Sequence, residues 1–422
     1  MARENAEFRG VAMLLPSVPP RPAGGAELQA LALSRALAAR GEHVFIVSEW
    51  APGLPDKAEL GGIAVFRPHG FLNVLWRAAA APLKFFKRKT PHADSVRTDY
   101  SALPEDGKKG ITVRRFGWLS VPYALVFAAN AFIFLRRRRH EFDVIHAHHA
   151  EWDGFAAVVL ARLLGKKALV KDSTVNGFRR LQNDAFGWRM KNCMKERAYF
   201  AALTGAIAGN LETEGVPPAR IFRIPNGVPL SPMAVPGNKP DSCLFVGNLT
   251  QQPAKGFDVL LRAWPLVVKN RPGAVLHVAG GGPAAAYGAY AEKLGIVSSV
   301  RFYGSVPDIS ALYSSAAVFV LPSRREGMSN ALLEAMAHGL PAVASAIPGM
   351  NEVVLEGETG LLVPPDDERS LALALSRLLG DAELSRTMGA AARKRAEEYF
   401  SLEKIAAVYS EVYRDITSRA CC

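Results

Sequence analysis

Cysteine and long uninterrupted apolar runs are scarce in this sequence. Only 4 of the 422 residues are Cys, and Cys193 and Cys243 stand alone, which excludes a disulfide scaffold and a paired zinc or redox motif. We therefore expect a reducing, intracellular setting. The first residues also lack the form of a secretory signal, because Glu4 and Glu7 precede a short apolar run that we interpret as a buried strand.

One apolar segment, residues 118–135, approaches the length of a membrane span and is followed by four Arg residues, 136–139. It contains Ser120, Pro122 and Asn130, and it barely reaches the roughly 20 residues that a spanning helix needs. We interpret it as a helix that is buried or lies on the surface; the alternative is a true span.

Acidic charge is deficient in the first half. Residues 1–210 hold 31 Lys and Arg against 18 Asp and Glu, whereas the remainder holds 20 against 21, so the first half carries the whole net charge of +12. This asymmetry indicates an anionic partner, such as a phosphorylated lipid or an acidic membrane face. The basic clusters at 84–89, 108–115 and 136–139 show no nucleic-acid-binding motif, so we expect no nucleic acid. The alternative is a solvated basic surface that aids solubility.

Short β-branched runs alternate with helical patterns in both halves, which predicts parallel sheets with helices on both faces. The predicted strands are 10–15, 43–48, 63–67, 144–148, 167–171, 206–208, 242–246, 275–279, 300–303, 318–321 and 342–344. The predicted helices include 25–40, 257–268, 330–337, 368–380, 383–400 and 401–418. We predict doubly wound domains over 1–215 and 241–398, a proline-rich hinge over 216–240, and a C-terminal helix in 399–422 that packs back on the first domain.

Ligands of open parallel sheets bind beyond the carboxyl ends of the strands. Among the loops at those ends, the one after 318–321 is the most informative. Ser329 or Asn330 can cap the following helix, whose free N–H groups form a ready anion site. Glu334 lies about one turn into that helix and can accept hydrogen bonds from a sugar diol, while Glu326 can reach another hydroxyl.

Seven motifs occur in order along the chain. Glu326 and Glu334 stand in the setting Pro-Ser-x-x-Glu-Gly-(x)6-Glu-Ala-Met-Ala-x-Gly-x-Pro. The other motifs are Gly24-Gly25-Ala26-Glu27 and the segments 143–148, 224–228, 246–256, 279–283 and 357–361. Together they resemble the family-4 retaining glycosyltransferases over nearly the whole chain.

The resemblance implies an α/β protein of GT-B fold, with two doubly wound Rossmann-like domains facing across a cleft. It implies a nucleotide-sugar donor on the second domain and an acceptor on the first, with no metal and no cofactor, since the nucleotide-sugar is a co-substrate. The implied catalytic residues are His148 beside the reacting centre, Lys255 on the donor diphosphate and Glu326 on the transferred sugar. The implied donor-binding set adds Gly24, Gly25, Asn248, Gly282, Gly327, Met328, Ser329, Asn330 and Glu334, the last of these on the ribose.

Asn248 departs from the family pattern, which usually has an Arg at this position as a second partner for the diphosphate. Arg324 or Arg325 is a candidate to compensate, but we favour a reduced yet sufficient charge supplied by Lys255. In addition, no His follows the predicted strand 167–171, where many relatives have one.

We expect a UDP- or GDP-sugar as donor and an acceptor hydroxyl that is lipid-linked, anionic or part of a cell-envelope polysaccharide or glycoconjugate. A cytoplasmic protein, peripheral on the inner membrane face, fits these expectations. Alternatives are a non-catalytic nucleotide-sugar-binding protein and a glycosyl phosphorylase of the same fold. A dehydrogenase is suggested by Gly280-x-Gly282-x-x-Ala285, but the next strand ends without the acidic residue that such an enzyme needs.

Overall fold

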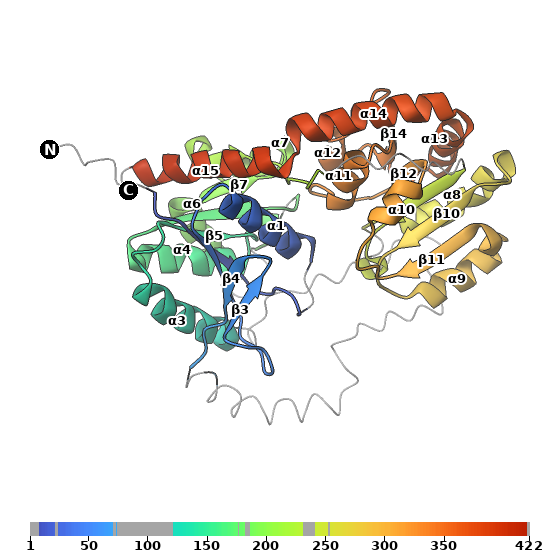
Figure 1. Cartoon of the computed structure of the whole chain (residues 1–422). Coiled ribbons are helices and arrows are strands. Elements are labelled where there is room, and N and C mark those ends of the chain that lie inside the picture. The colour runs from blue at the N-terminus through green and yellow to red at the C-terminus, as the bar shows by residue number, and fades with distance from the viewer. Residues whose placement is uncertain are drawn as a thin grey trace. The chain divides into compact units, whose positions relative to one another are not determined.

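The computed structural model describes residues 8–21, 24–70, 73, 121–175, 177–181, 186–230, 241–251 and 254–419. These residues form two compact units, each built on one sheet (Figure 1). The first unit comprises the described residues up to Gly227 and again from Leu402, and the second comprises those within Val228–Ser401. The basic clusters at 84–89 and 108–115 lie outside the described residues.

The first unit is built on an eight-stranded sheet. Its order is β3 (Lys57–Leu60), β4 (Ile63–Phe66), β2 (Val44–Ser48), β1 (Val11–Leu15), β5 (Val144–Ala147), β6 (Lys167–Asp172), β7 (Tyr199–Ala202) and β8 (Ile221–Arg223). Every pairing is parallel except that of β3 with β4. The strand order reverses at β1, which lies between β2 and β5, so the sheet has a switch point there.

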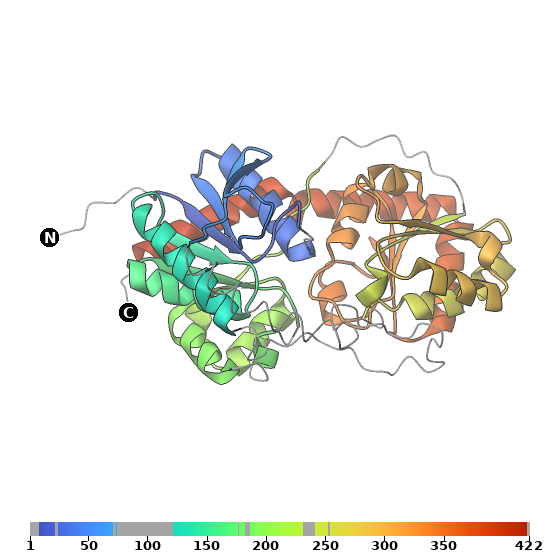
Figure 2. The same ribbon diagram turned by 90° about the horizontal axis from the view of Figure 1, so that it is seen from below.

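Helices cover both faces of this sheet. Figures 1 and 2 show α1 (Gly25–Ala39) beside α15 (Leu402–Ser418) on one face, and α3 (Val121–Arg137) beside α4 (Trp152–Leu164) on the other. The remaining helices are α5 (Gly177–Arg180), α6 (Gly187–Arg197), α7 (Gly205–Thr213) and the 3-10 turn η3 (Pro218–Arg220). On the α1 and α15 face, Met13, Leu169 and Tyr409 belong to one buried apolar core that joins the sheet to the last helix of the chain.

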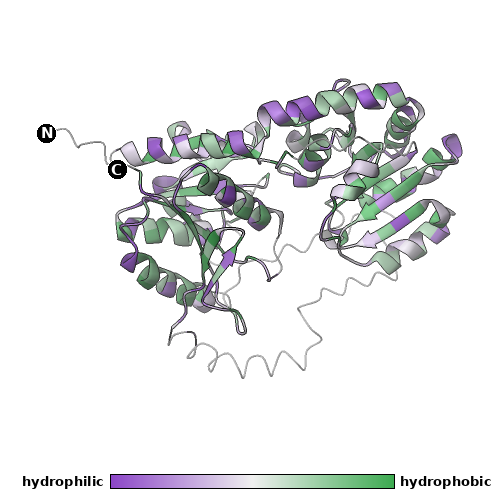
Figure 3. Cartoon of the chain, in the orientation of Figure 1, coloured by the Kyte–Doolittle hydropathy of each residue, from purple (hydrophilic) through white to green (hydrophobic). Residues whose placement is uncertain are grey.

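The second unit has six parallel strands. Their order is β11 (Val300–Gly304), β10 (Val275–Ala279), β9 (Ser242–Val246), β12 (Val318–Leu321), β13 (Ala342–Ser345) and β14 (Gly360–Val363). Its helices are α8 (Phe257–Asn270), α9 (Ala284–Lys293), α10 (Ser310–Ser315), α11 (Asn330–Ala337), α12 (Pro348–Asn351), α13 (Glu368–Gly380) and α14 (Ala382–Tyr399), with 3-10 turns η4 (Leu249–Gln251) and η5 (Val297–Ser299). The strands are largely apolar, as their green colour in Figure 3 shows, because helices cover both faces.

One strand prediction was wrong. Residues 206–208 were predicted as a strand but belong to α7, which Thr204 caps by accepting a hydrogen bond from the Ile207 amide at 3.3 Å. The strand of this region is β7, which ends at Ala202, just before α7 begins. Part of the predicted hinge is also ordered structure, because β8 pairs with β7 at the edge of the first sheet.

The apolar segment at 118–135 is described from Val121 as the helix α3. Phe127 is buried and meets the Trp152 ring edge-on, with the ring centroids 5.7 Å apart, whereas Leu125 is 64% exposed. This helix therefore packs on its unit by one side. Throughout the described ranges, every helix is too short or too polar to cross a membrane.

Candidate active site

The second sheet brings its predicted functional loops together at its switch point. The strand order reverses at β9, which lies between β10 and β12. The loop after β9 carries Lys255, and the loop after β12 carries Glu326. Since parallel strands all end at the same edge, two loops that are 71 residues apart in sequence become neighbours.

Lys255 and Glu326 form a close ion pair. The Lys255 Nζ donates to both carboxylate oxygens of Glu326, at 2.9 Å to Oε1 and 2.8 Å to Oε2. Only 15% of the lysine side chain and 14% of the glutamate side chain are exposed. The two residues predicted to hold the diphosphate and the sugar thus neutralise each other.

Two glycines allow the loops to approach this closely. Gly256 has φ +63°, and a Cβ there would lie 1.8 Å from the Pro322 carbonyl oxygen at the end of β12. Gly280 has φ +141°, and its Cβ would lie 1.9 Å from the Gly247 carbonyl oxygen. Any larger residue would push the loops after β9, β10 and β12 apart.

The segment from Gly327 to Asn330 leads into α11. Gly327, Met328 and Ser329 are buried, and the Ser329 hydroxyl accepts a hydrogen bond from the Leu332 amide at 3.4 Å, as expected for an N-cap. α11 begins at Asn330, where the prediction placed it. The first amides of this helix and its positive dipole end are suited to an anion.

Glu334 lies in the second turn of α11 and is held by a residue that the sequence analysis missed. The Tyr313 hydroxyl donates to Glu334 Oε2 at 2.9 Å. Burial raises the pKa of the Glu334 carboxyl, and the Tyr313 hydrogen bond opposes that rise. The carboxylate therefore has a fixed direction with one oxygen already in use.

The structure bears directly on the departure at Asn248. The Asn248 Oδ1 accepts from the Thr250 amide at 2.9 Å and from the Thr250 hydroxyl at 2.7 Å, so the side chain shapes its own turn. The Arg324 guanidinium forms a two-pronged pair with Asp258 at 2.8 and 2.7 Å. This pairing commits Arg324 to Asp258 and argues against Arg324 as the replacement cation.

The first unit also places predicted residues at its switch point. Gly24 is the N-cap of α1 after β1, and its amide donates to Glu27 Oε2 at 2.9 Å. Glu27 also lies 3.8 Å from Nε2 of His149, which follows β5, and the other ring nitrogen of His149 lies 3.2 Å from Asp153. Burial lowers the pKa of His149, but Asp153 and Glu27 outweigh it and raise this pKa to about 9. His149 is thus a positively charged group that links the first turns of α1 and α4 through Glu27 and Asp153.

His148 has a different environment from His149. It is fully buried, and neither ring nitrogen has a hydrogen-bond partner among the described residues. Its ring stacks on that of His146 at 4.4 Å, as the alternation along β5 predicts. Burial, followed by the charges of its neighbours, lowers the pKa of His148 far below its usual value, so the ring is neutral at pH 7.

Lys171 stands beside His148. Ala147 pairs with Val170 across β5 and β6, so the next residues, His148 and Lys171, are neighbours on the same face. The Lys171 Nζ donates to Asn226 Oδ1 at 2.8 Å and lies 6.0 Å from the centre of the Tyr409 ring on α15. Burial lowers the pKa of Lys171 to about 7.

This geometry agrees with the comparison with protein families. Residues 23–232 match the family described as Glycosyltransferase Family 4, and residues 240–381 match Glycosyl transferases group 1. The chain belongs to glycosyltransferase family 4.

Known relatives of this family-4 chain include enzymes and solved structures. It is 29% identical over 329 residues to a D-inositol 3-phosphate glycosyltransferase of Corynebacterium efficiens, covering 70% of this chain and 76% of that protein. Three other curated relatives match over only 22%, 46% and 48% of their own lengths.

Two solved structures establish the fold. A sucrose-phosphate synthase from Thermosynechococcus elongatus superposes with a TM-score of 0.74 at 22% identity. The superposition covers 98% of this chain and 100% of the synthase chain. The Anabaena protein HepE in complex with UDP-glucose gives a TM-score of 0.66 at 17% identity, covering 96% and 99%. The family-4 chain therefore has the GT-B fold, with two Rossmann-like domains.

Tyr313, Lys171 and Asn226 were not singled out as site residues from the sequence. Tyr313 lies in the six-residue helix α10, where a lone aromatic predicts only packing. Asn226 belongs to a motif that was noted, at 224–228, and a polar residue there could have been weighed as a partner for a buried cation. Within the described residues, no group of three His, Cys, Asp or Glu side chains is arranged to hold a metal ion.

Proposed function

We propose that this chain is a retaining glycosyltransferase that moves a sugar from a nucleoside diphosphate to an acceptor hydroxyl. The observation that carries the proposal is the pair of Lys255 and Glu326 at the switch point of the second sheet. Glu326 lies on the loop that leads into α11, the helix that carries Glu334, and Lys255 joins it from the loop after β9. Family membership and the UDP-glucose bound to HepE support a nucleotide-sugar as the donor.

The ion pair provides a physical route for binding and for leaving-group stabilisation. An entering diphosphate competes with Glu326 for the Lys255 ammonium, because a phosphate offers more negative charge than one carboxylate. Glu326 then becomes available to accept hydrogen bonds from the sugar hydroxyls. When the bond between sugar and diphosphate breaks, Lys255 and the amides before α11 stabilise the growing negative charge. No metal is needed in this scheme.

His148 supplies a second component on the first unit. A buried neutral imidazole with two unpartnered nitrogens is costly unless a ligand satisfies it. We propose that a sugar hydroxyl does so, which orients the donor for attack by the acceptor from the same face as the leaving group, with retention of configuration.

The acceptor is proposed to be anionic or lipid-linked. The first half holds 31 basic against 18 acidic residues, and the Corynebacterium relative is named for a phosphorylated acceptor. Such an enzyme would act in the cytoplasm, in contact with an anionic membrane surface when its acceptor is a lipid.

A donor screen tests the proposal. UDP-, GDP- and ADP-sugars are each incubated with the full chain, and release of nucleoside diphosphate is measured together with the shift in unfolding temperature. We expect one base class to stabilise the chain and to be hydrolysed slowly without acceptor. Stabilisation without any turnover, even with lipid-linked acceptors, would favour the non-catalytic alternative that Asn248 suggests. No stabilisation by any nucleotide would overturn both.

A further inference from the structure

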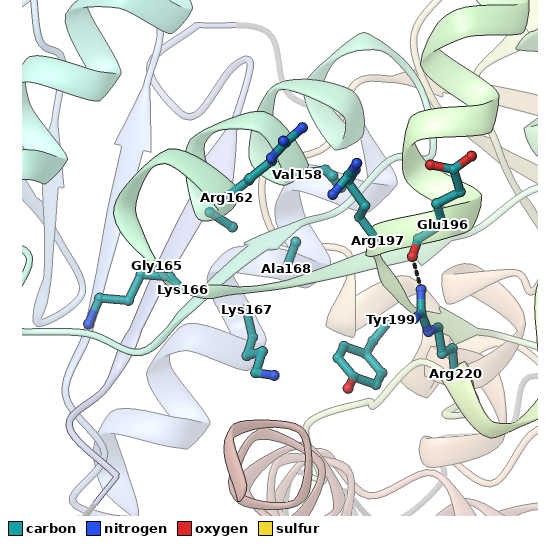
Figure 4. A pocket seen from close by; sticks show the side chains of 11 residues that line it. Val158, Arg162, Gly165, Lys166, Lys167, Ala168, Glu196, Arg197, Tyr199 and Arg220 are labelled. Carbon is teal, nitrogen blue, oxygen red and sulfur yellow. Dashed lines mark hydrogen bonds between the residues drawn. The ribbon is translucent and has the colours of Figure 1, made fainter. Parts of the chain in front are cut away.

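A basic pocket lies at the opposite edge of the first sheet from His148. It has a volume of about 460 Å³ and is formed by the ends of α4 and α6 and the amino ends of β6 and β7 (Figure 4). Lys167 begins β6 and lines this pocket, whereas Lys171 is four residues further on, about 13 Å along the strand at 3.3 Å per residue. A ligand here is therefore separate from the candidate active site.

The lining of the pocket is strongly positive. Its basic residues are Arg162, Lys166, Lys167, Arg197 and Arg220, and Glu196 is its one acidic residue. Lys166 lies 3.2 Å from Asp143, and Arg220 donates to the backbone carbonyl of Glu196. Arg162 and Arg197 are exposed and form no ion pair with any carboxylate of the described chain.

Helix ends explain only part of this charge. α4 and α6 both end at the pocket, and each helix C-terminus carries about half a negative charge, which basic residues in the last turn complement. The two ends together offset about one of the five cations, Glu196 offsets a second, and Asp143 offsets at most a third because it also pairs with Arg9. Within the described residues about two positive charges remain without a counter-charge, and Arg162 and Arg197 carry them.

Arg162 and Arg197 both lie close enough to Cys193 to influence its thiol. Both guanidinium groups lower the pKa of the Cys193 thiol on α6, against the larger effect of burial, which raises it. Figure 4 shows the two arginines above the strands, reaching from α4 and α6, with Lys167 and Tyr199 below. Val158 and Ala168 add apolar surface beside them.

We propose that this pocket binds a phosphate group attached to a small organic group, either an anionic lipid headgroup or a soluble phosphate ester. Arginine matches phosphate because its planar fork donates two parallel hydrogen bonds. The volume of about 460 Å³ exceeds what a bare phosphate fills, and the apolar wall suits the attached carbon atoms. The pocket thereby gives part of the positive charge of the first half a specific ligand.

Binding to the full-length chain tests this proposal in two arms. One arm uses phosphatidylcholine vesicles with and without phosphatidylglycerol, and the other uses glycerol 3-phosphate in solution. The pocket variant is Arg162→Ala/Arg197→Ala, and the matched control is Arg40→Ala/Arg136→Ala, which removes the same charge from exposed positions of the same unit. We expect the pocket variant to lose at least about tenfold in affinity in one arm, and the control to lose less than about twofold.

The two arms distinguish the source of the phosphate. Binding to anionic vesicles alone assigns a lipid headgroup, whereas binding of glycerol 3-phosphate, with slower alkylation of Cys193, assigns a soluble ester. A third variant, Arg162→Lys/Arg197→Lys, keeps the charge and should lose most of the affinity if the fork geometry matters. Equal losses in the pocket and control variants, or no binding by the parent chain in either arm, would overturn the proposal. Thermal unfolding of each variant confirms that it is folded.

Discussion

The two units place their candidate functional groups by one rule but stabilise them differently. In each sheet the predicted groups follow strands that flank the switch point, β1 and β5 in the first and β9 and β12 in the second, and Lys171 lies near the end of the next strand, β6. In the second unit the charged groups are paired, Lys255 with Glu326 and Glu334 with Tyr313. In the first unit His149 is also paired, but within the described residues the buried His148 ring has no hydrogen-bond partner, and the buried Lys171 ammonium faces an amide oxygen and the Tyr409 ring rather than a carboxylate. A ligand of the second unit would replace one member of an existing pair, whereas a ligand of the first unit would supply a hydrogen-bond partner that the protein itself does not.

Removing the lysine of the second unit should have the largest effect. Lys255→Ala is expected to reduce turnover of the donor by about 100- to 1000-fold, because it removes a preorganised positive charge from the leaving group. Steady-state release of nucleoside diphosphate measures the loss. Lys269→Ala, at an exposed position on α8, is the control and should be unchanged. Normal turnover in Lys255→Ala would remove the charge-stabilisation argument.

Removing the histidine of the first unit should separate rate from binding. His148→Ala is expected to lower the rate of transfer about 100-fold while nucleotide affinity changes little, because the nucleotide is assigned to the second unit. Single-turnover kinetics and calorimetric titration with the nucleotide measure the two quantities, with the exposed His140→Ala as control. A comparable loss in both would contradict this division of labour between the units.

The pH dependence of stability should reveal the buried cations of the first unit. The pKa of Lys171 is lowered to about 7, so between pH 7 and 9 the unfolded chain binds more protons there and stability rises with pH. The pKa of His149 is raised to about 9, so its contribution to stability is complete below its unfolded pKa and is lost as pH rises through 9. Each contributes up to about 1.4 kcal/mol per pH unit, with opposite signs.

The parent chain should therefore show a nearly flat stability between pH 7 and 9. Lys171→Met should make stability fall with rising pH, and His149→Gln should make it rise. Denaturant unfolding at several pH values measures these slopes. Identical slopes in the two variants would show that the groups do not titrate as their surroundings indicate.

The partner of Glu334 should have a smaller effect than the charged pair. Tyr313→Phe is expected to weaken nucleotide binding about threefold to tenfold, because one neutral hydrogen bond that orients the carboxylate is lost. Tyr303→Phe, at a tyrosine that is 44% exposed on β11, is the control. Unchanged affinity in Tyr313→Phe would indicate that packing alone orients Glu334.

The smallest effect is expected at Asn248. Asn248→Arg restores the charge that family-4 relatives usually carry and should raise the rate of donor hydrolysis a few-fold, provided that the turn closed by Thr250 survives. A loss of nucleotide affinity would instead show that this turn is what the position supplies.

Sequence patterns predicted the elements whose signal is local. α11 was predicted at its observed bounds because Ser329 and the helical spacing of its apolar residues mark its limits. β9 and β10 were predicted from short, mainly apolar runs, although Ser242 begins β9 and His277 interrupts β10. The strand β3 was missed because an edge strand with alternating exposure resembles a loop.

Local patterns could not predict the contacts that complete the candidate site. The bond between Lys171 and Asn226 joins residues 55 positions apart, and the 2.7 Å contact of His146 Nδ1 with the Tyr413 hydroxyl spans 267 positions. Such partners are determined by tertiary packing. A single Tyr or Lys in an apolar element forms no residue spacing from which its role could be predicted. The predicted site residues stand in sequence motifs, whereas Tyr313 and Lys171 are identified as site residues only by their contacts in the fold.

The packing of α15 on the first sheet has a consequence for biosynthesis. The 17 residues of this helix supply Tyr409 and Tyr413 to the core beneath His146, although the strands that they cover are made first. A nascent chain emerging from the ribosome must keep the part of that apolar sheet face that α15 covers exposed until this helix has been made. The strands of the first unit thus reach their final packing only after the second unit has been made, and the apolar surface that they expose until then is a natural target for chaperones.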